Sequence, residues 1–195
     1  MTMAKVLQLL PPATPLDDGT LVERALGGAD WAKRELFQRH AARVLGFLTR
    51  LLGSTADAED ASQDAFVEAF RDLPKLREAR DFGRWVMRIA VHQAHRRFRR
   101  RRLLSFVGLD SPDLDATLDA LADEHANAEH RAELALMQKA VSRMPAQERT
   151  AWVLRHVEGY ELTEVADALS VSLATAKRRL AAADARLAVV TGVTP

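Results

Sequence analysis

The stretch from Asp81 to Arg102, DFGRWVMRIAVHQAHRRFRRRR, constrains the fold of this chain more than any other. Its apolar residues recur at the spacing of one helix face, at Phe82, Trp85, Val86 and Ile89. A narrower stripe of the same helix carries Arg84, Arg88, His95, Arg99 and Arg102, with His92 at its edge. The spacing predicts a helix that packs through an aromatic face and presents a column of guanidinium groups beside that face.

The arginine density at the end of this helix predicts an anionic partner. Six of the seven residues from Arg96 to Arg102 are arginine, with Phe98 between them. These charges repel one another unless an anion lies alongside, and a nucleic-acid backbone is the leading candidate. A solvated helix end, or a basic segment bound by an acidic protein, is the alternative.

Length and composition describe a soluble globular chain. Its 195 residues suffice for one or two domains, with 48% hydrophobic and 28% charged residues. No apolar run approaches the ~20 residues of a membrane span, so we expect no membrane insertion. The chain contains no cysteine, which excludes disulfides, thiolate zinc sites and thiol nucleophiles. Residues 1–19 lack the pattern of a signal peptide, and we expect a flexible leader on a cytoplasmic protein.

The net charge of +1 is divided along the chain into a basic, an acidic and a mildly basic block. Residues 1–109 hold 19 Lys and Arg against 13 Asp and Glu, residues 110–133 one against eight, and residues 134–195 eight against six. This pattern predicts two modules, at residues 20–102 and 129–195, joined by an acidic linker at 103–128. The linker is either a simple tether or a segment that rests against the arginines when no nucleic acid is present.

Helical patterns fill both modules and no strand-like alternation occurs, so the predicted fold class is all-α. In the first module a capping box at Thr20 opens a short helix, and Asp30 is expected to cap a long helix that Gly53 closes. Ser54 or Thr55 caps the next helix. The polar side of that helix carries Asp57, Asp60, Asp64 and Glu68, with Gln63 at its boundary. On composition alone, these acids serve solubility.

The second module ends in a predicted helix-turn-helix. A helix from Leu162 to Leu169 is followed by the turn Ser170–Ser172, and Ser172 caps a helix that begins at Leu173. This second helix is expected to bury Leu173, Ala176, Leu180 and Leu187. It projects away from them Thr175, Arg178, Arg179 and Arg186, with Lys177 at the flank. Such side chains near the start of a second helix are typical of DNA-binding proteins, and a plain helical hairpin is the alternative.

Together these features resemble the alternative sigma factors of the sigma-70 family, in their compact two-domain extracytoplasmic-function (ECF) form. The likeness covers about residues 28–102 and 133–190. DAEDASQDAFVEAFRDLPKL resembles the region 2.2 helix, which docks on the β′ subunit of RNA polymerase. FGRWVMRIAVHQAHRRFRRRR resembles the helix of regions 2.3 and 2.4, which opens and reads the −10 promoter element. MPAQERTAWVLRHVEGYELTEVADALSVSLATAKRRL resembles region 4, whose helix-turn-helix reads the −35 element.

The resemblance implies roles for individual residues. The implied polymerase-binding residues are Asp57, Asp60, Gln63, Asp64 and Arg71. The implied −10 residues are Arg84, Trp85, Arg88, His92, Arg96 and Arg99. The implied −35 residues are Ser172, Thr175, Lys177, Arg178 and Arg179. The implied partners are core RNA polymerase, promoter DNA and an anti-sigma factor, with no cofactor, no metal and no small-molecule substrate.

Three departures from the family pattern bear on promoter choice. Family members usually carry Asn where this chain has His92, and Asp where it has Arg96. Asn offers a donor and an acceptor to one base edge, whereas neutral His offers them on separate ring atoms, so a different −10 preference is expected. After Leu180 the usual basic residues are replaced by Ala-Ala-Ala-Asp, which predicts weaker phosphate anchoring at the −35 element.

The sequence therefore predicts a promoter-specificity subunit that binds core RNA polymerase and has no catalysis of its own. A stand-alone helix-turn-helix regulator that binds duplex DNA as a dimer is the alternative. It explains residues 133–190 but leaves the acidic and the arginine-rich helices without a role. An RNA-binding or anti-termination protein that uses the arginine run is a second alternative.

Overall fold

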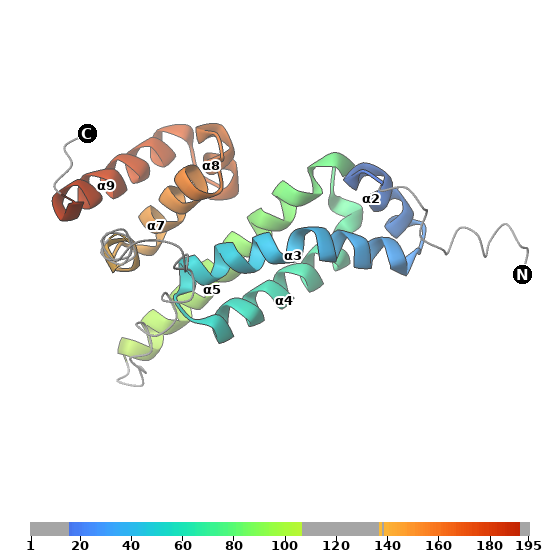
Figure 1. Cartoon of the computed structure of the whole chain (residues 1–195), viewed down its shortest axis with the longest axis horizontal. Coiled ribbons are helices and arrows are strands. Elements are labelled where there is room, and N and C mark those ends of the chain that lie inside the picture. Colours follow the sequence, from blue (N-terminus) through green and yellow to red (C-terminus); the bar gives the residue numbers. More distant parts are fainter. Residues whose placement is uncertain (1–15, 107–136, 138, 192–195) are drawn as a thin grey trace, which may run out of the picture.

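The computed structural model describes residues 16–106, 137 and 139–191. Every regular element in this part of the chain is helical, which confirms the predicted fold class (Figure 1). The first module contains α2 (Asp18–Leu26), α3 (Asp30–Leu52), α4 (Thr55–Arg71), the short turns η1 (Leu73–Lys75) and η2 (Ala79–Asp81), and α5 (Phe82–Phe106). The second contains α7 (Ala146–Trp152), the π-helical turn η4 (Val153–Val157), α8 (Leu162–Ala168) and α9 (Leu173–Thr191).

Parts of the predicted leader and linker lie outside the described residues. These parts are residues 1–15 and residues 107–128. Helix α5 continues four residues past Arg102, to Phe106. Among the described helices, none combines the length and the apolarity that a bilayer crossing requires.

The end of α3 and the start of α4 follow the predicted local chemistry, and the starts of α2 and α3 do not. Ala29, not Asp30, is the N-cap of α3, and Asp30 is the first residue of the helix. Gly53 takes the left-handed φ of 66° that closes α3. The Ser54 hydroxyl then caps α4 by accepting a hydrogen bond from the Asp57 N–H at 3.3 Å. The capping box at Thr20 is wrong, because the Asp17 carboxylate accepts the Thr20 N–H at 3.0 Å and caps the helix three residues earlier.

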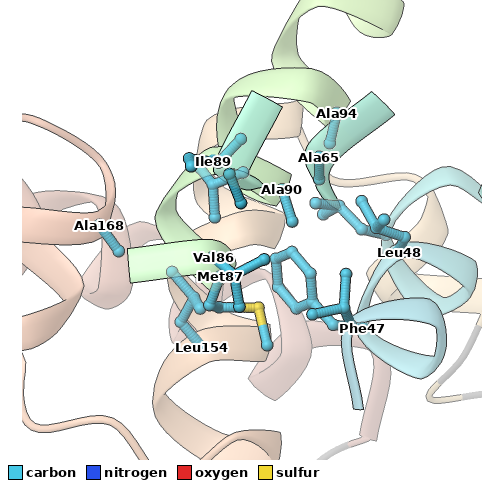
Figure 2. Packing of buried hydrophobic residues seen from close by; sticks show 14 of the residues in the cluster. Phe47, Leu48, Ala65, Val86, Met87, Ile89, Ala90, Ala94, Leu154 and Ala168 are labelled. Carbon is cyan, nitrogen blue, oxygen red and sulfur yellow. The ribbon is translucent and has the colours of Figure 1, made fainter. Parts of the chain in front are cut away.

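Helices α3, α4 and α5 form the core of the first module. Helix α3 contributes large, fully buried side chains, including Phe47 and Leu48. Helices α4 and α5 contribute small ones, including Ala65, Ala90 and Ala94 (Figure 2). The distance between packed helices depends on the side chains at their contact, so alanines on both helices let α4 and α5 approach closely.

The second module packs on the first through a shared apolar core. Leu154 of η4 belongs to the same cluster of buried side chains as Val86 and Met87 of α5 (Figure 2). Leu154 and Val86 are 0% exposed and Met87 is 1% exposed. Since burial of apolar surface stabilises by about 25 cal/mol per Å², this contact holds the two modules together in the free chain.

One predicted core residue of the helix-turn-helix is wrong, and another is only half-buried. Leu173 is 41% exposed and Leu180 is half-buried, whereas Ala176 and Leu187 are buried as expected. Leu173 is the first residue of α9, directly after its cap, and the buried face of the helix begins only one turn later, at Ala176. Helical periodicity predicts which face of a helix is apolar. It does not predict whether other elements cover that face in the first turn.

The helix packing predicts a large difference between two matched leucine substitutions. Leu48→Ala removes a side chain that is 0% exposed, and should lower the free energy of unfolding by about 2–5 kcal/mol. Leu103→Ala, at a side chain that is 70% exposed on α5, should change it by less than about 0.5 kcal/mol. Urea denaturation followed by circular dichroism measures both. Equal effects of the two substitutions would contradict this packing.

Candidate nucleic-acid and polymerase interfaces

The arginines of α5 divide between two faces of the helix. Arg97 and Arg101 turn toward α4, where the Arg97 guanidinium lies 2.9 Å from an Asp64 carboxylate oxygen and Arg101 pairs with Asp57. Arg101 also donates to the Leu52 carbonyl at 3.0 Å, at the C-terminus of α3. The remaining arginines near the end of α5 are exposed; they are Arg96, Arg99, Arg100 and Arg102. Part of the charge repulsion in the arginine run is therefore relieved inside the protein.

A ladder of polar contacts continues these pairs along α4 and α5. The Gln93 amide, which is 4% exposed, donates to a Glu68 carboxylate oxygen at 2.7 Å. From Asp57 to Glu68 the partners on α5 run backwards along the chain, so the two helices are antiparallel. The ladder fixes which face of α5 is turned to solvent.

The five predicted polymerase-binding residues fall into two groups on α4. Asp57 and Asp64 form ion pairs with α5, and Asp60 and Gln63 do not; Asp57 is half-buried, whereas Asp64, Asp60 and Gln63 are all exposed. The fifth, Arg71, is exposed at the end of α4 and lies 3.2 Å from the Asp72 carboxylate. This contact lowers the pKa of Asp72.

An apolar groove that the sequence did not reveal lies between α3 and α4. Its volume is about 590 Å³, and Gln63 and Glu59 are part of its lining. Phe37 and Val67, which also line it, are 43% and 61% exposed. The Phe37 ring meets the Phe66 ring with 4.8 Å between the ring centroids, so Phe37 is both partly exposed and in contact with a buried side chain.

The six predicted −10 residues lie along α5, and the second module contacts two of them. The Arg84 guanidinium is 2.7 Å from a Glu164 carboxylate oxygen of α8. His92 Nε2 is 3.3 Å from the Ser170 hydroxyl, in the turn of the helix-turn-helix. Burial of the ring and the nearby charge of Arg88 lower the pKa of His92, so the ring is mostly neutral near pH 7.

Trp85 is half-buried: its ring packs against the core of the first module and also lines a cavity at the surface. Its ring lies 6.1 Å from that of Phe82, which is fully buried. Its other side lines a cavity of about 620 Å³ between the modules, together with Arg84, Arg88 and Tyr160. Arg88 and Arg99 are exposed, as their stripe predicted, and Arg96, which lies outside that stripe, is exposed as well.

His95 is held in one tautomer by the second module. The Thr150 hydroxyl, on a residue that is 0% exposed, donates its proton to the Ala146 carbonyl at 2.7 Å. The contact of 3.1 Å between His95 Nε2 and the same hydroxyl oxygen therefore requires a proton on Nε2. Burial is the main cause that lowers the pKa of His95 to about 4, with smaller contributions from His92, Arg179 and Arg99.

The helix-turn-helix forms as predicted, and its five predicted −35 residues gather at the start of α9. The Ser172 hydroxyl accepts the Thr175 N–H at 3.3 Å and caps the helix. Lys177 and Arg178 are exposed. Arg179 is half-buried, and burial followed by the charge of Arg178 lowers its pKa. In the turn, Ser170 takes a φ of 53°, a left-handed conformation uncommon outside glycine.

Sequence reasoning missed Arg149, the most buried arginine of the described residues. It is 7% exposed, and its guanidinium donates to the carbonyls of Leu51 at 2.8 Å and Met144 at 3.1 Å. It also lies over the Phe98 ring, 5.4 Å from the centroid. Burial lowers its pKa to about 10, so it stays charged near pH 7. Because the Leu51 carbonyl and the Phe98 ring come from the other module, no local sequence pattern marks Arg149.

Within the described ranges, no three His, Asp or Glu side chains lie close enough together to hold a metal ion. The exposed groups of α5 and α9 are instead guanidinium, ammonium, imidazole and hydroxyl donors. Such groups bind phosphates and base edges.

Comparison with known proteins identifies both modules. The family model of sigma-70 region 2 matches residues 36–103, and that of sigma-70 region 4 matches residues 134–187. This chain belongs to the sigma-70 family. A similar relative is the ECF RNA polymerase sigma factor SigM of Mycobacterium tuberculosis, 33% identical over 176 residues that cover 90% of this chain and 85% of the relative. The RNA polymerase sigma-H factor of Pseudomonas aeruginosa is 28% identical, covering 86% of this chain and 90% of the relative.

Solved structures give the same fold. The sigma factor RpoE of Bartonella quintana, in complex with the anti-sigma factor NepR, superposes with a TM-score of 0.69 at 18% identity, covering 83% of this chain and 98% of that chain. CnrH in complex with the cytosolic domain of CnrY superposes with a TM-score of 0.64 at 23% identity, covering 90% and 97%. The predicted membership of the ECF sigma factors is therefore confirmed. A stand-alone regulator is not favoured, because matches to region 2 and region 4 account for both modules.

The buried His95 predicts loss of stability in acid. Its pKa is about 4 in the folded sigma factor and about 6.5 in the unfolded chain, so between these values the unfolded chain binds more protons. Stability is therefore lost as the pH falls through this window, by up to about 2 kcal/mol near pH 5.

The measurement is a comparison of urea unfolding of the wild type and His95→Gln near pH 7 and near pH 5. Gln retains a donor for the Thr150 hydroxyl but does not titrate. The change in stability between the two pH values is compared for the wild type and the variant, so ionisations that both proteins share cancel. The variant should lose less stability on acidification than the wild type. Equal losses would show that His95 is not the group responsible.

Proposed function

We propose that this sigma factor binds core RNA polymerase through α4, holds the opened −10 strand on α5 and reads the −35 element with α9. One observation carries the proposal: the chain contains sigma-70 region 2 followed by sigma-70 region 4, and the exposed side chains of their helices differ in charge. Exposed acidic and amide groups gather on α4, and exposed basic groups gather on α5 and α9. The protein directs polymerase to specific promoters and, like other sigma factors, is not an enzyme.

On the polymerase side, Asp60 and Gln63 provide the contacts that are available without rearrangement. Both are exposed, and Gln63 borders the apolar groove between α3 and α4. An interface that combines an apolar centre with a polar rim is the usual anatomy of protein recognition. Asp57 and Asp64 contribute by orienting α4 on α5, and can exchange their arginine partners for groups of polymerase. Arg71 extends the surface at the end of α4.

On the −10 side, the exposed face of α5 offers charge for the backbone and a ring for a base. Arg84, Arg88, Arg96 and Arg99 contact phosphates of the melted strand, and Trp85 borders an unstacked base. Base stacking on an aromatic ring contributes about 1–3 kcal/mol, which helps offset unpairing. His92, mostly neutral near pH 7, reads the base edge that Asn reads in the family, and Arg96 adds positive charge where the family has Asp.

On the −35 side, the start of α9 enters the major groove. Its first residues, Ser172 and Thr175, lie where a recognition helix meets base edges and phosphates. Lys177, Arg178 and Arg179 supply phosphate contacts. We further propose that the protein acts in the cytoplasm and is held by an anti-sigma factor, because the similar structures include sigma factors bound to such partners.

Two assays with purified core polymerase test this function. Native co-migration with the core measures assembly, and start-site mapping after induced expression gives both promoter elements at once. Failure to bind the core and to direct initiation at any promoter would overturn the proposal.

Charge reversal on α4 should weaken assembly with the core. Asp60→Lys replaces a negative charge by a positive one at an exposed position of the proposed docking surface. The substitution should lower the affinity for core polymerase about tenfold. Glu23→Lys, an equally exposed reversal on α2 of the same module, should leave it unchanged. Native gel titration measures both affinities, and circular dichroism verifies that the variants are folded. Equal loss in both variants would argue against a specific α4 surface.

Two Arg→Gln variants of α9 should differ in the salt dependence of promoter binding. Arg178→Gln removes a proposed phosphate contact and should reduce the slope of log affinity against log salt by about one, whatever the sequence. Arg186→Gln should leave the slope unchanged, since Arg186 lies 2.7 Å from Glu148 within the same module. Holoenzyme binding to a labelled promoter fragment at several salt concentrations measures the slope. The same slope for the wild type and both variants would show that Arg178 does not contact a phosphate of the promoter.

A further inference from the structure

Two arginines of α3 converge on one anion, at a place that the proposed promoter contacts leave unused. Arg43 Nε and Arg50 Nη2 donate to the Glu158 carboxylate at 2.9 and 2.8 Å, one guanidinium on each oxygen. Arg43 also donates to the Glu158 carbonyl at 3.1 Å. The side chain of Glu158 is only 4% exposed, whereas those of Arg43 and Arg50 are 47% and 31% exposed. The first module thus carries a two-arginine anion site, and the second module supplies the anion.

The chemistry of this site suits a phosphate as well as a carboxylate. Guanidinium groups bind both anions through paired N–H donors. Arg50 Nε is buried and has no hydrogen-bond partner among the described residues, so the site holds a donor that the carboxylate does not use. Two like charges that share one anion repel each other when that anion leaves. A site without Glu158 therefore favours another anion.

Glu158 cannot stay at this site while both promoter elements are read. By their names the −10 and −35 elements lie about 25 base pairs apart, or about 85 Å of duplex at 3.4 Å per pair. The recognition helix α9 has 19 residues, a length of about 28 Å. Ser170, in the turn before α9, is only 3.3 Å from His92 of α5. When α9 lies in the −35 element, the second module has therefore taken Glu158 away from α3.

The site lies on the side of the first module that carries the proposed −10 residues. Helices α3 and α5 pack against each other (Figure 1). The second module contacts α5 where Glu164 binds Arg84 at 2.7 Å, and it contacts α3 through Glu158. These two acids are six residues apart in the chain, so at most about 21 Å separates them. That distance equals about six base pairs of duplex, which brings a promoter strand on α5 within reach of the α3 site.

We propose that Arg43 and Arg50 bind a backbone phosphate of the promoter in the initiation complex, at the place that Glu158 occupies in the free chain. The phosphate lies within about six base pairs of the −10 element. The inference rests on the proposed function, because it requires promoter DNA along α5. It adds α3 to the helices that contact DNA.

The first test is the salt dependence of promoter binding by assembled holoenzyme. Arg43→Gln combined with Arg50→Gln removes one phosphate contact and should reduce the slope of log affinity against log salt by about one. Between about 50 and 200 mM salt, the double variant should therefore lose about 3.5-fold less affinity than the wild type. The probe is a labelled fragment of a mapped promoter.

The matched control removes two positive charges from the same module at other places. It combines Arg24→Gln with Arg39→Gln. Arg24 is exposed on α2, and Arg39 binds the Asp18 carboxylate at 2.7 Å and the Leu16 carbonyl at 2.8 Å. The slope of the control should equal that of the wild type. Circular dichroism and native gels verify that every variant is folded and assembled with core polymerase.

The second test locates the phosphate. Neutral methylphosphonate linkages are placed one at a time in the −10 element and in the six base pairs on either side. At the contacted position the neutral linkage should weaken binding by the wild-type holoenzyme about tenfold, and it should have no effect on the double variant. Equal losses in the two proteins at every position would overturn the proposal.

The outcomes separate this site from the proposed function. If the wild type directs initiation but the double variant keeps the wild-type slope, the phosphate site fails and the proposed function stands. If the double variant loses affinity for core polymerase and keeps the slope, the two arginines bind an acidic group of polymerase, which also overturns the phosphate site. If the wild-type holoenzyme binds no promoter, both proposals fail.

Discussion

The packing of α5 against α3 and α4 is the constraint on which the rest of the structure depends. One face of α5 is core, with Val86 and Ala90 fully buried, and the opposite face carries the proposed promoter contacts. Rotation of α5 about its axis would expose apolar side chains and bury arginines, which is costly for both. The orientation of every −10 residue is thus set by apolar burial on the other side of the same helix.

Arginine serves two purposes in this protein, and tertiary neighbours decide between them. Arg97, Arg101 and Arg149 bind carboxylates or the last carbonyls of α3, where positive charge is favourable at a helix C-terminus. Arg96 and Arg99, in the same short run, face solvent. Planar guanidinium groups suit both tasks, since they satisfy several acceptors inside the protein and phosphates outside it. Counting arginines therefore overestimates the surface available to nucleic acid.

The helices and the family were accessible from local patterns. Ser54 and Ser172 mark helix starts, Gly53 marks an end, and the 3.6-residue period of the Asp81–Arg102 stretch selects the buried face. Each of these signals depends on residues within one or two helical turns of one another, so the local sequence contains all the residues that take part. Errors occur at helix starts, where local patterns compete or end. Asp17 caps the helix in place of Thr20, and Leu173, in the first turn of α9, is left exposed.

The sequence by itself determined the all-α fold, the two sigma-70 modules and the charged face of each through periodicity, capping and charge. Only the tertiary structure decided which acids of α4 are already paired, that Phe37 opens onto a groove, and that Glu158 joins the modules through Arg43 and Arg50. The partners in that last contact lie more than one hundred residues apart in the chain, 115 and 108. Such a contact depends on how two folded surfaces meet, and no local pattern encodes that.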